Sequence, residues 1–175
     1  MVWFFTGNGD SGKTDLFGGT RVFKDDHTID LIGIIDEVNA YIGLAISLIK
    51  QPETKKDLWM IQTTLSKVMG VIAGASESAI NEFDVGKSIE WLEDKIDLYG
   101  RELNNPKRFT YPGKNTAGAA LDICRAATRK MERRAVGFLR ENLKIEKKIL
   151  AYMNRLSSLF YILRLLADKD VNTSR

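Results

Sequence analysis

The three prolines of this 175-residue chain all lie between long segments with the periodicity of α-helices. From about residue 28 onward, apolar residues recur at intervals of three and four, which places them on one face of a helix. The expected helices cover about residues 28–50, 53–82, 85–103, 116–142 and 146–169. Thr28 or His27 is the expected N-cap of the first helix, and Asn115 that of the fourth. The pattern predicts an all-α fold, a five-helix up-and-down bundle with a Gly-rich irregular N-terminal arm.

Composition and charge are those of one globular domain without a general affinity for nucleic acid or membranes. Hydrophobic residues make up 44% of the chain and charged residues 28%, and the formal net charge is only +3. A single cysteine excludes an internal disulfide and fits a reducing compartment. The opening residues lack the basic start of a signal peptide, and no uninterrupted apolar stretch reaches membrane-spanning length. We therefore expect a cytoplasmic protein with one domain over residues 1–175, made of an arm (1–27), a bundle (28–169) and a tail (170–175).

Residues 7–14 match the phosphate-loop pattern G-x-x-x-x-G-K-[ST], but the sequence that follows argues against an NTPase. A phosphate loop opens a helix, whose free N–H groups hold the phosphates. Here Gly18 and Gly19 come within the next turn, and a glycine pair is a poor start for a helix. The apolar segment 31–37, which ends in two acids, has helical spacing and leaves no βαβ unit for a nucleotide-binding sheet.

The glycines of the same segment have a second use. Gly7, Gly9 and Gly12 allow the backbone to turn successive N–H groups inward as an anion-binding nest. The polar side chains beside this nest are Thr6, Lys13 and Thr14. Phosphate binding is the favoured interpretation, and a Gly-rich turn without a ligand is the alternative.

The expected helix 116–142 has two faces with different chemistry. Its apolar face, assigned to the core, comprises Ala117, Ala120, Leu121, Cys124, Ala127, Thr128, Met131 and Phe138. A second face carries the residues at i, i+4, i+7 and i+8, which are Arg125, Arg129, Glu132 and Arg133. This spacing fits a solvated basic face as well as a phosphate site. In a phosphate site, guanidinium groups would bind the oxygens and Glu132 would orient its neighbours or accept from a ribose or a metal-bound water.

The remaining polar candidates are weak when each is taken alone. Asn154 and Arg155 interrupt an apolar run in the last helix, and Asp36 lies inside the first. Such residues are more often solvated or satisfied within the fold than ligands. His27 is the only histidine and Cys124 the only thiol, so we expect neither a metal cluster nor Ser-His-Asp or Cys-His catalysis. Cys124 lies on the apolar face and is expected to be inert.

Taken together, five motifs occur in one order along the chain. They are Thr6-x-x-Gly9-Asp10-x-Gly12-x-Thr14, Lys24-Asp25-Asp26, Gly33-x-x-Asp36-Glu37-x-Asn39-x-x-x-Gly43, Cys124-Arg125-x-x-x-Arg129-x-x-Glu132-Arg133 and Asn154-Arg155-Leu156-Ser157. With them the chain resembles, over nearly its full length, the ATP:cob(I)alamin adenosyltransferases of the propanediol-utilisation type, the family that includes the human mitochondrial enzyme. The resemblance implies a homotrimer of five-helix bundles with active sites between subunits.

The resemblance also implies how ATP would be held. In the arm, the expected ATP-binding residues are Thr6, Gly7, Asn8, Gly9, Asp10, Gly12, Lys13, Thr14 and Lys24. Arg129 and Arg133 would neutralise the phosphates. Glu132 would help to hold magnesium or orient an arginine, and Asn154 would fix the nucleotide by hydrogen bonds. Gly7 stands where the family usually has Lys or Arg, so Lys13 is the expected replacement cation.

On the corrinoid side, the resemblance implies three further roles. Asp36 would pair with Arg125 across subunits. Phe109 would occupy the lower face of cobalt, which removes a polar lower ligand and makes cobalt(II) easier to reduce. With Arg129, these are the expected catalytic residues. Two other departures from the family pattern are Lys130, which replaces an Arg, and Ser158, which replaces an Asp.

The implied reaction transfers the 5′-deoxyadenosyl group of ATP to the cobalt of reduced cobalamin and releases triphosphate. A reductase would supply the electron for cobalt, and a B12-dependent enzyme could receive the product. Two alternatives stay open at this point. One is a phosphate-loop NTPase, and the other is a non-catalytic ATP- or RNA-binding helical bundle.

Overall fold

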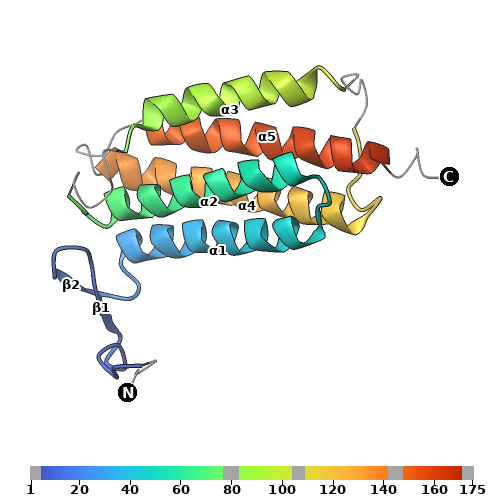
Figure 1. Cartoon of the computed structure of the whole chain (residues 1–175). Coiled ribbons are helices and arrows are strands. Elements are labelled where there is room, and N and C mark those ends of the chain that lie inside the picture. The colour runs from blue at the N-terminus through green and yellow to red at the C-terminus, as the bar shows by residue number, and fades with distance from the viewer. Residues whose placement is uncertain (1–4, 77–82, 104–108, 142–147, 171–175) are drawn as a thin grey trace.

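The computed structural model of the chain describes residues 5–76, 83–103, 109–141 and 148–170 (Figure 1). In these ranges the elements are β1 (Lys13–Asp15), β2 (Arg21–Phe23), α1 (His27–Leu48), α2 (Pro52–Ile72), α3 (Val85–Gly100), α4 (Thr116–Glu141) and α5 (Lys148–Asp170). The five helices confirm the all-α bundle expected from the periodicity.

The helices of the bundle run side by side, with α4 in contact with both α1 and α5 (Figure 1). Helix α3 covers the other side of α5, and α2 packs on α1. The largest fully buried apolar side chains come from all five helices and include Leu31, Leu58, Leu92, Met131 and Phe160. Helices α1 and α5 are long and apolar enough to span a membrane by length and composition, a test that core helices of bundles also pass.

The starts of α1 and α4 are fixed by side-chain caps. For α1 the sequence prediction of Thr28 or His27 is wrong, because Asp26 is the cap: its Oδ1 accepts from the Thr28 amide at 2.7 Å. Hydrogen bonds from the side chain and the amide of Thr28 lower the pKa of Asp26. For α4 the prediction is confirmed, since Asn115 Oδ1 accepts from the Gly118 amide at 2.8 Å.

Helix α2 ends earlier than the sequence pattern predicts. The expected helix ran to Glu82, whereas α2 ends at Ile72. Gly74 has φ +82°, a left-handed conformation that terminates helices, and its amide donates to the Val71 carbonyl at 3.1 Å. The spacing of apolar residues alone does not reveal that a single glycine ends this helix. Residues 77–82 lie outside the described ranges.

The N-terminal arm contains a small hairpin, which the sequence prediction of an irregular arm did not include. Strands β1 and β2 are antiparallel, with Thr14 opposite Val22. Gly18 and Gly19 form the turn with positive φ, so the glycine pair that argues against a helix makes a hairpin connection instead. The arm projects away from the helices beyond the start of α1 (Figure 1).

Two glycines of α4, one near each end of the helix, give a matched test of packing. Gly118 tests the contact with α5, and Gly137 is the control. A Cβ on Gly118 would lie 2.7 Å from Asp168 Oδ1, whereas a Cβ on Gly137 would have no atom within 4 Å. Gly118→Ala is therefore expected to lower the free energy of unfolding by about 1–3 kcal/mol through overpacking. Gly137→Ala should raise it by about 0.5–1 kcal/mol through helix propensity. Denaturant unfolding measures both, and equal stabilisation by the two variants would show that Asp168 yields freely.

Candidate active site

A hydrogen-bonded chain of side chains joins α4 to α5 on the outer side of the bundle. Asn154 Nδ2 donates to Glu132 Oε1 at 3.0 Å, and Asn154 Oδ1 accepts from Arg155 Nη1 at 3.1 Å. Arg155 Nε in turn donates to Glu93 Oε1 at 2.8 Å. The amide of Asn154 is thus held from both ends. The structure brings together Glu132 and Asn154, which the sequence placed 22 positions apart.

The cations of α4 divide into those with an acidic partner and those without one. Lys130 Nζ lies 2.9 Å from Glu37 Oε2, and Arg134 pairs with Asp30, so both are tied to acids of α1. The bond with Lys130 lowers the pKa of Glu37. Arg129 and Arg133 are exposed and have no hydrogen-bond or ion-pair partner in the part of the chain that the structure describes. Two guanidinium groups beside the Glu132–Asn154 pair are therefore available to an anion.

Arg125 and Asp36 do not meet within one chain. Arg125 Nε donates to Asp122 Oδ1 at 2.9 Å, one turn earlier on α4, and this bond raises the pKa of Arg125. Asp36 is exposed on α1. The expected Asp36–Arg125 pair was assigned to two different subunits, so the single chain leaves it as a prediction.

The glycines of the arm form a tight turn, while binding of an anion by this turn stays a prediction. Gly7 and Gly12 have φ +73° and +77°, conformations that favour glycine. The amides of Asp10 and Gly12 donate to the carbonyls of Gly7 and Gly9 at 3.1 and 3.2 Å. The side chain of Lys24 lies over this turn, because a Cβ on Gly9 would be 3.1 Å from Lys24 Nζ. We call residues 6–14 with Lys24 the nest.

Other side chains of the arm hold the nest in shape. Arg21 donates to the Asn8 carbonyl and lies 3.4 Å from Asp15 Oδ1. The sequence analysis missed Arg21, since it lies outside the glycine pattern and its role depends on the hairpin. Lys13 Nζ lies 4.7 Å from the centre of the Phe23 ring, which is a cation–π contact. Thr6 Oγ1 accepts weakly from the Asn8 amide at 3.4 Å.

The nest and the arginine face of α4 are separate in one chain. Among the described residues, no hydrogen bond or ion pair joins residues 6–24 to α4. The arm lies off the end of its own bundle (Figure 1). Strand β1 also begins at Lys13, where an NTPase would begin a helix, so the structure argues against the phosphate-loop NTPase.

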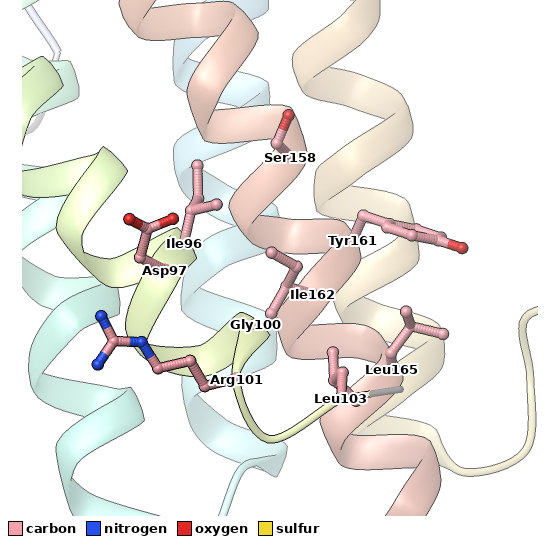
Figure 2. Close-up of a pocket in the computed structure, with 9 residues that line it drawn as sticks. All are labelled: Ile96, Asp97, Gly100, Arg101, Leu103, Ser158, Tyr161, Ile162 and Leu165. Atoms are coloured by element: carbon pink, nitrogen blue, oxygen red, sulfur yellow. The ribbon is translucent and has the colours of Figure 1, made fainter. Parts of the chain in front are cut away.

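A cavity of about 630 Å³ lies between α3 and α5 (Figure 2). Ser158, Tyr161 and Leu165 line it from α5, Asp97 lines it from α3, and Arg101 lines it from the position that follows α3 (Figure 2). The ring of Tyr161 points away from α3. Among the lining residues that the structure describes, those of α5 include the hydroxyl groups of Ser158 and Tyr161 and no carboxylate.

Phe109 lies in the loop before α4 with 80% of its surface exposed. Its ring contacts that of Tyr111 edge to face, with the centroids 5.1 Å apart. An exposed aromatic pair that completes no helix face is available to a flat apolar ligand.

Cys124 takes no part in this chemistry. Its thiol is fully buried on the apolar face of α4, and burial raises its pKa to about 12. A nucleophilic cysteine needs a lowered pKa and access to substrate. Among the described residues, no group of three or more His, Cys, Asp or Glu is placed to hold a metal ion. The chain therefore offers cationic and amide groups for a bound anion in place of its own nucleophile.

These features define a five-helix bundle with a glycine-rich arm and, among the described residues, two exposed arginines of α4 without acidic partners. The sequence profile of the cobalamin adenosyltransferase family matches residues 4–167. The corrinoid adenosyltransferase of Bacillus subtilis is 36% identical over 161 residues, which cover 90% of this chain and 82% of that protein. The human corrinoid adenosyltransferase MMAB is 32% identical over 180 residues, 98% of this chain and 71% of that protein.

Solved structures agree with these relatives. A variant of a PduO-type ATP:corrinoid adenosyltransferase from Lactobacillus reuteri, in complex with cobalamin and ATP, superposes with a TM-score of 0.86 at 30% identity. The match covers 95% of this chain and 94% of that one. The chain therefore belongs to the cobalamin adenosyltransferase family, and the resemblance seen in the sequence motifs is confirmed.

The reactivity of the Cys124 thiol tests whether this side chain is buried in the core, as described above. Because a pKa of about 12 leaves almost no thiolate at pH 8, Ellman's reagent should react with the folded protein more than about a hundredfold more slowly than with the protein unfolded in denaturant. A Ser66→Cys variant, with its new thiol on the exposed side of α2, is the accessible control. Fast reaction of Cys124 in the folded protein would contradict the packing described above.

Proposed function

We propose that the chain adenosylates a reduced corrinoid at the face formed by Arg129, Arg133, Glu132 and Asn154, with ATP as the adenosyl donor. As a member of its family the chain is a corrinoid adenosyltransferase, which transfers the 5′-deoxyadenosyl group of ATP to the cobalt of reduced cobalamin and releases triphosphate. The observation that carries this site is a pair of exposed guanidinium groups beside a fixed amide, with no acidic partner among the residues that the structure describes.

The chemistry matches a site that has no activated nucleophile of its own. In the reaction, the electron pair of cobalt(I) attacks the 5′ carbon of ATP, and a cobalt–carbon bond forms. The bond from this carbon to oxygen breaks, its electron pair leaves with triphosphate, and cobalt becomes cobalt(III). The protein must place the 5′ carbon and stabilise charge on the departing triphosphate. Arg129 and Arg133 would do the second, and Asn154 would hold the nucleoside.

We place the complete site between copies of the chain in a homotrimer. The arm projects from its own bundle and forms no hydrogen bond to its own α4 within the described residues, so its nest is positioned to reach a neighbouring copy. Lys24 and Lys13 would then add positive charge to the phosphates that the arginines hold. The same arrangement would bring Asp36 of one copy to Arg125 of another, where it would compete with Asp122.

Glu132 would help to hold magnesium beside the phosphates in this site. Mg²⁺ is commonly held by one or two carboxylates together with substrate phosphates. Glu132 fits this need, because Oε1 is taken by Asn154 while Oε2 has no partner among the described residues. Bound there, the ion would supply charge neutralisation for the triphosphate.

The cellular setting is part of the proposal. A reductase would deliver the electron that converts cobalt(II) to cobalt(I), and a B12-dependent enzyme would accept the adenosylated product. Both would meet the chain in the cytoplasm, in keeping with a single unpaired cysteine.

The direct test is anaerobic incubation of the protein with ATP, Mg²⁺ and chemically reduced cobalamin. The absorption of cobalt(I) should decay as adenosylcobalamin forms, with one triphosphate released for each corrinoid converted. Release of ADP and phosphate without an adenosylated corrinoid would contradict the proposal and indicate an NTPase.

Arg129→Ala should lose most of this activity. One charge-assisted contact that strengthens in the transition state contributes about 2–4 kcal/mol, or roughly two to three orders of magnitude in rate. Turnover at saturating ATP measures the loss. Arg134→Ala is the matched control, because this arginine of the same helix is tied to Asp30, and its turnover should stay near that of the parent protein. Similar rates for both variants would remove Arg129 from the site.

Phe109→Ala separates covering of cobalt from packing of the loop. The ring is 80% exposed, so its removal should leave ATP affinity and thermal stability nearly unchanged. The variant should still adenosylate cobalt(I) cobalamin but fail from cobalt(II) with a weak reductant, since the lower ligand then stays on cobalt. The electron paramagnetic resonance spectrum of bound cobalt(II) should show that ligand. Equal losses from both starting states would assign Phe109 to packing.

A further inference from the structure

The largest fully buried side chain in the described part of the chain is charged. Arg164, on α5, is 1% exposed. Its Nη1 donates to Thr110 Oγ1 at 2.6 Å, and its Nη2 donates to the Thr110 carbonyl at 2.9 Å. Both hydrogen bonds go to the one residue that follows Phe109 in the chain. The guanidinium group therefore ties the start of the described loop 109–115 to α5.

The other end of this loop is tied to the next turn of α5. Arg164 Nε lies 3.3 Å from Asp168 Oδ2, and Asp168 is also buried. Asn115 Nδ2 donates to the Ala167 carbonyl at 2.8 Å and lies 3.5 Å from Asp168 Oδ1. Since Asn115 also caps α4, the loop is held at both ends by two successive turns of one helix.

A buried ion pair is an unfavourable way to stabilise a core. Removing two charges from water costs several kcal/mol, and well-packed apolar residues often stabilise such a place equally well. Arg164 makes contacts that an apolar residue could not make. Its planar guanidinium group binds both the hydroxyl and the carbonyl of Thr110. Such a fork fixes the direction of the loop as well as its distance from α5.

The group that depends most on this direction is Phe109. Its ring contacts Tyr111 and is otherwise exposed, so no core packing fixes its place. Arg164 also lies over Tyr161, with Cζ 5.9 Å from the ring centre, and Tyr161 lines the cavity between α3 and α5. One buried side chain thus contacts both the loop with Phe109 and the aromatic wall of the cavity.

We propose that Arg164 is a positioning residue for the corrinoid side of the reaction: its fork on Thr110 holds the Phe109 loop at the height at which the ring can cover the lower face of cobalt. This inference rests on the proposed function of Phe109. Arg164 itself is buried and acts only through Thr110.

The test compares four variants with the parent protein. Thr110→Val removes the hydroxyl acceptor and keeps the shape, Thr110→Ser restores the hydroxyl, and Arg164→Lys keeps the charge but loses the fork. Thr63→Val is the matched control, because this threonine is exposed on α2 and bonds only to the Trp59 carbonyl of its own helix. Each protein is assayed from cobalt(I) and from cobalt(II) cobalamin, with the KM for ATP, the resonance spectrum of bound cobalt(II) and hydrogen exchange of the amides at 109–113.

We expect Thr110→Val to slow adenosylation from cobalt(II) by about tenfold, because it strands a buried charged donor, with a much smaller loss from cobalt(I) and no change in the KM for ATP. Exchange at 109–113 should rise, and the lower-ligand signal of cobalt(II) should return in part. Arg164→Lys should show the same pattern more strongly. Thr110→Ser and Thr63→Val should behave like the parent protein.

Two results would overturn the proposal while the parent protein remains active. One is unchanged exchange and unchanged cobalt(II) spectra in Thr110→Val and Arg164→Lys. The other is an equal loss from both cobalt states together with a raised KM for ATP, which a general loss of structure would produce. An inactive parent protein would instead overturn the proposed function, and with it the role of the loop.

Discussion

The angular position of α4 about its own axis determines where most charged residues of the candidate site point. Its buried stripe packs against α1 and α5 at once, so the helix cannot rotate without exposing Leu121, Cys124 and Met131. Each fully buried side chain of this size contributes about 1.5–3 kcal/mol, which makes such a rotation prohibitive. The same packing fixes Arg129 and Arg133 outward and brings Glu132 within 3.0 Å of Asn154. The charged face is thus a consequence of the core.

Periodicity in the sequence predicted this arrangement well, because helix faces repeat every three to four residues. The apolar stripe of α4 was found in this way, and the preference of Asn for the first cap position predicted the Asn115 cap. The prediction failed where a single residue decides the outcome. Asp26 caps α1 in place of Thr28 or His27, and Gly74 ends α2 ten residues before the expected Glu82. In each case the hydrogen bonds of one residue set the end of the helix, and the spacing of apolar residues does not reveal that end.

Polar contacts between residues far apart in the chain could not be predicted from the sequence, for a different reason. Arg164 and Asp168 are spaced i and i+4, which on most helices describes a solvated pair. Only the fold shows that both are buried and that Thr110, 54 positions away, accepts from the arginine. Arg21 was missed likewise, because the hairpin brings it to Asn8. The sequence identified residues with site chemistry, whereas the groups that position them required the structure.

The phosphate-loop pattern shows how similar local geometry can serve a different electrostatic design. In an NTPase the helix that follows the loop adds the positive end of its dipole to the loop amides. Here β1 follows, so no helix stands behind the nest, and the amides of Asp10 and Gly12 already donate to carbonyls of the same turn. In the proposed site, positive charge would therefore come from side chains: Lys24 over the turn, and arginines from α4. This need would account for a site divided between an arm and a helix face.

Such a division requires each part to hold its own shape before the substrates arrive. The arm meets this need through Arg21, which binds both Asn8 and Asp15 of the same hairpin. The α4–α5 face meets it through the chain from Glu132 to Glu93, and the corrinoid loop through Arg164. Since cobalt(I) supplies the nucleophile, the protein needs accurate placement more than acid–base chemistry, and placement is effective only between groups that do not have to be ordered during the reaction. That requirement fits the side chains that the structure does hold in place, the Asn154 amide between Glu132 and Arg155 and the Thr110 loop on Arg164, and it fits a thiol that lies in the core.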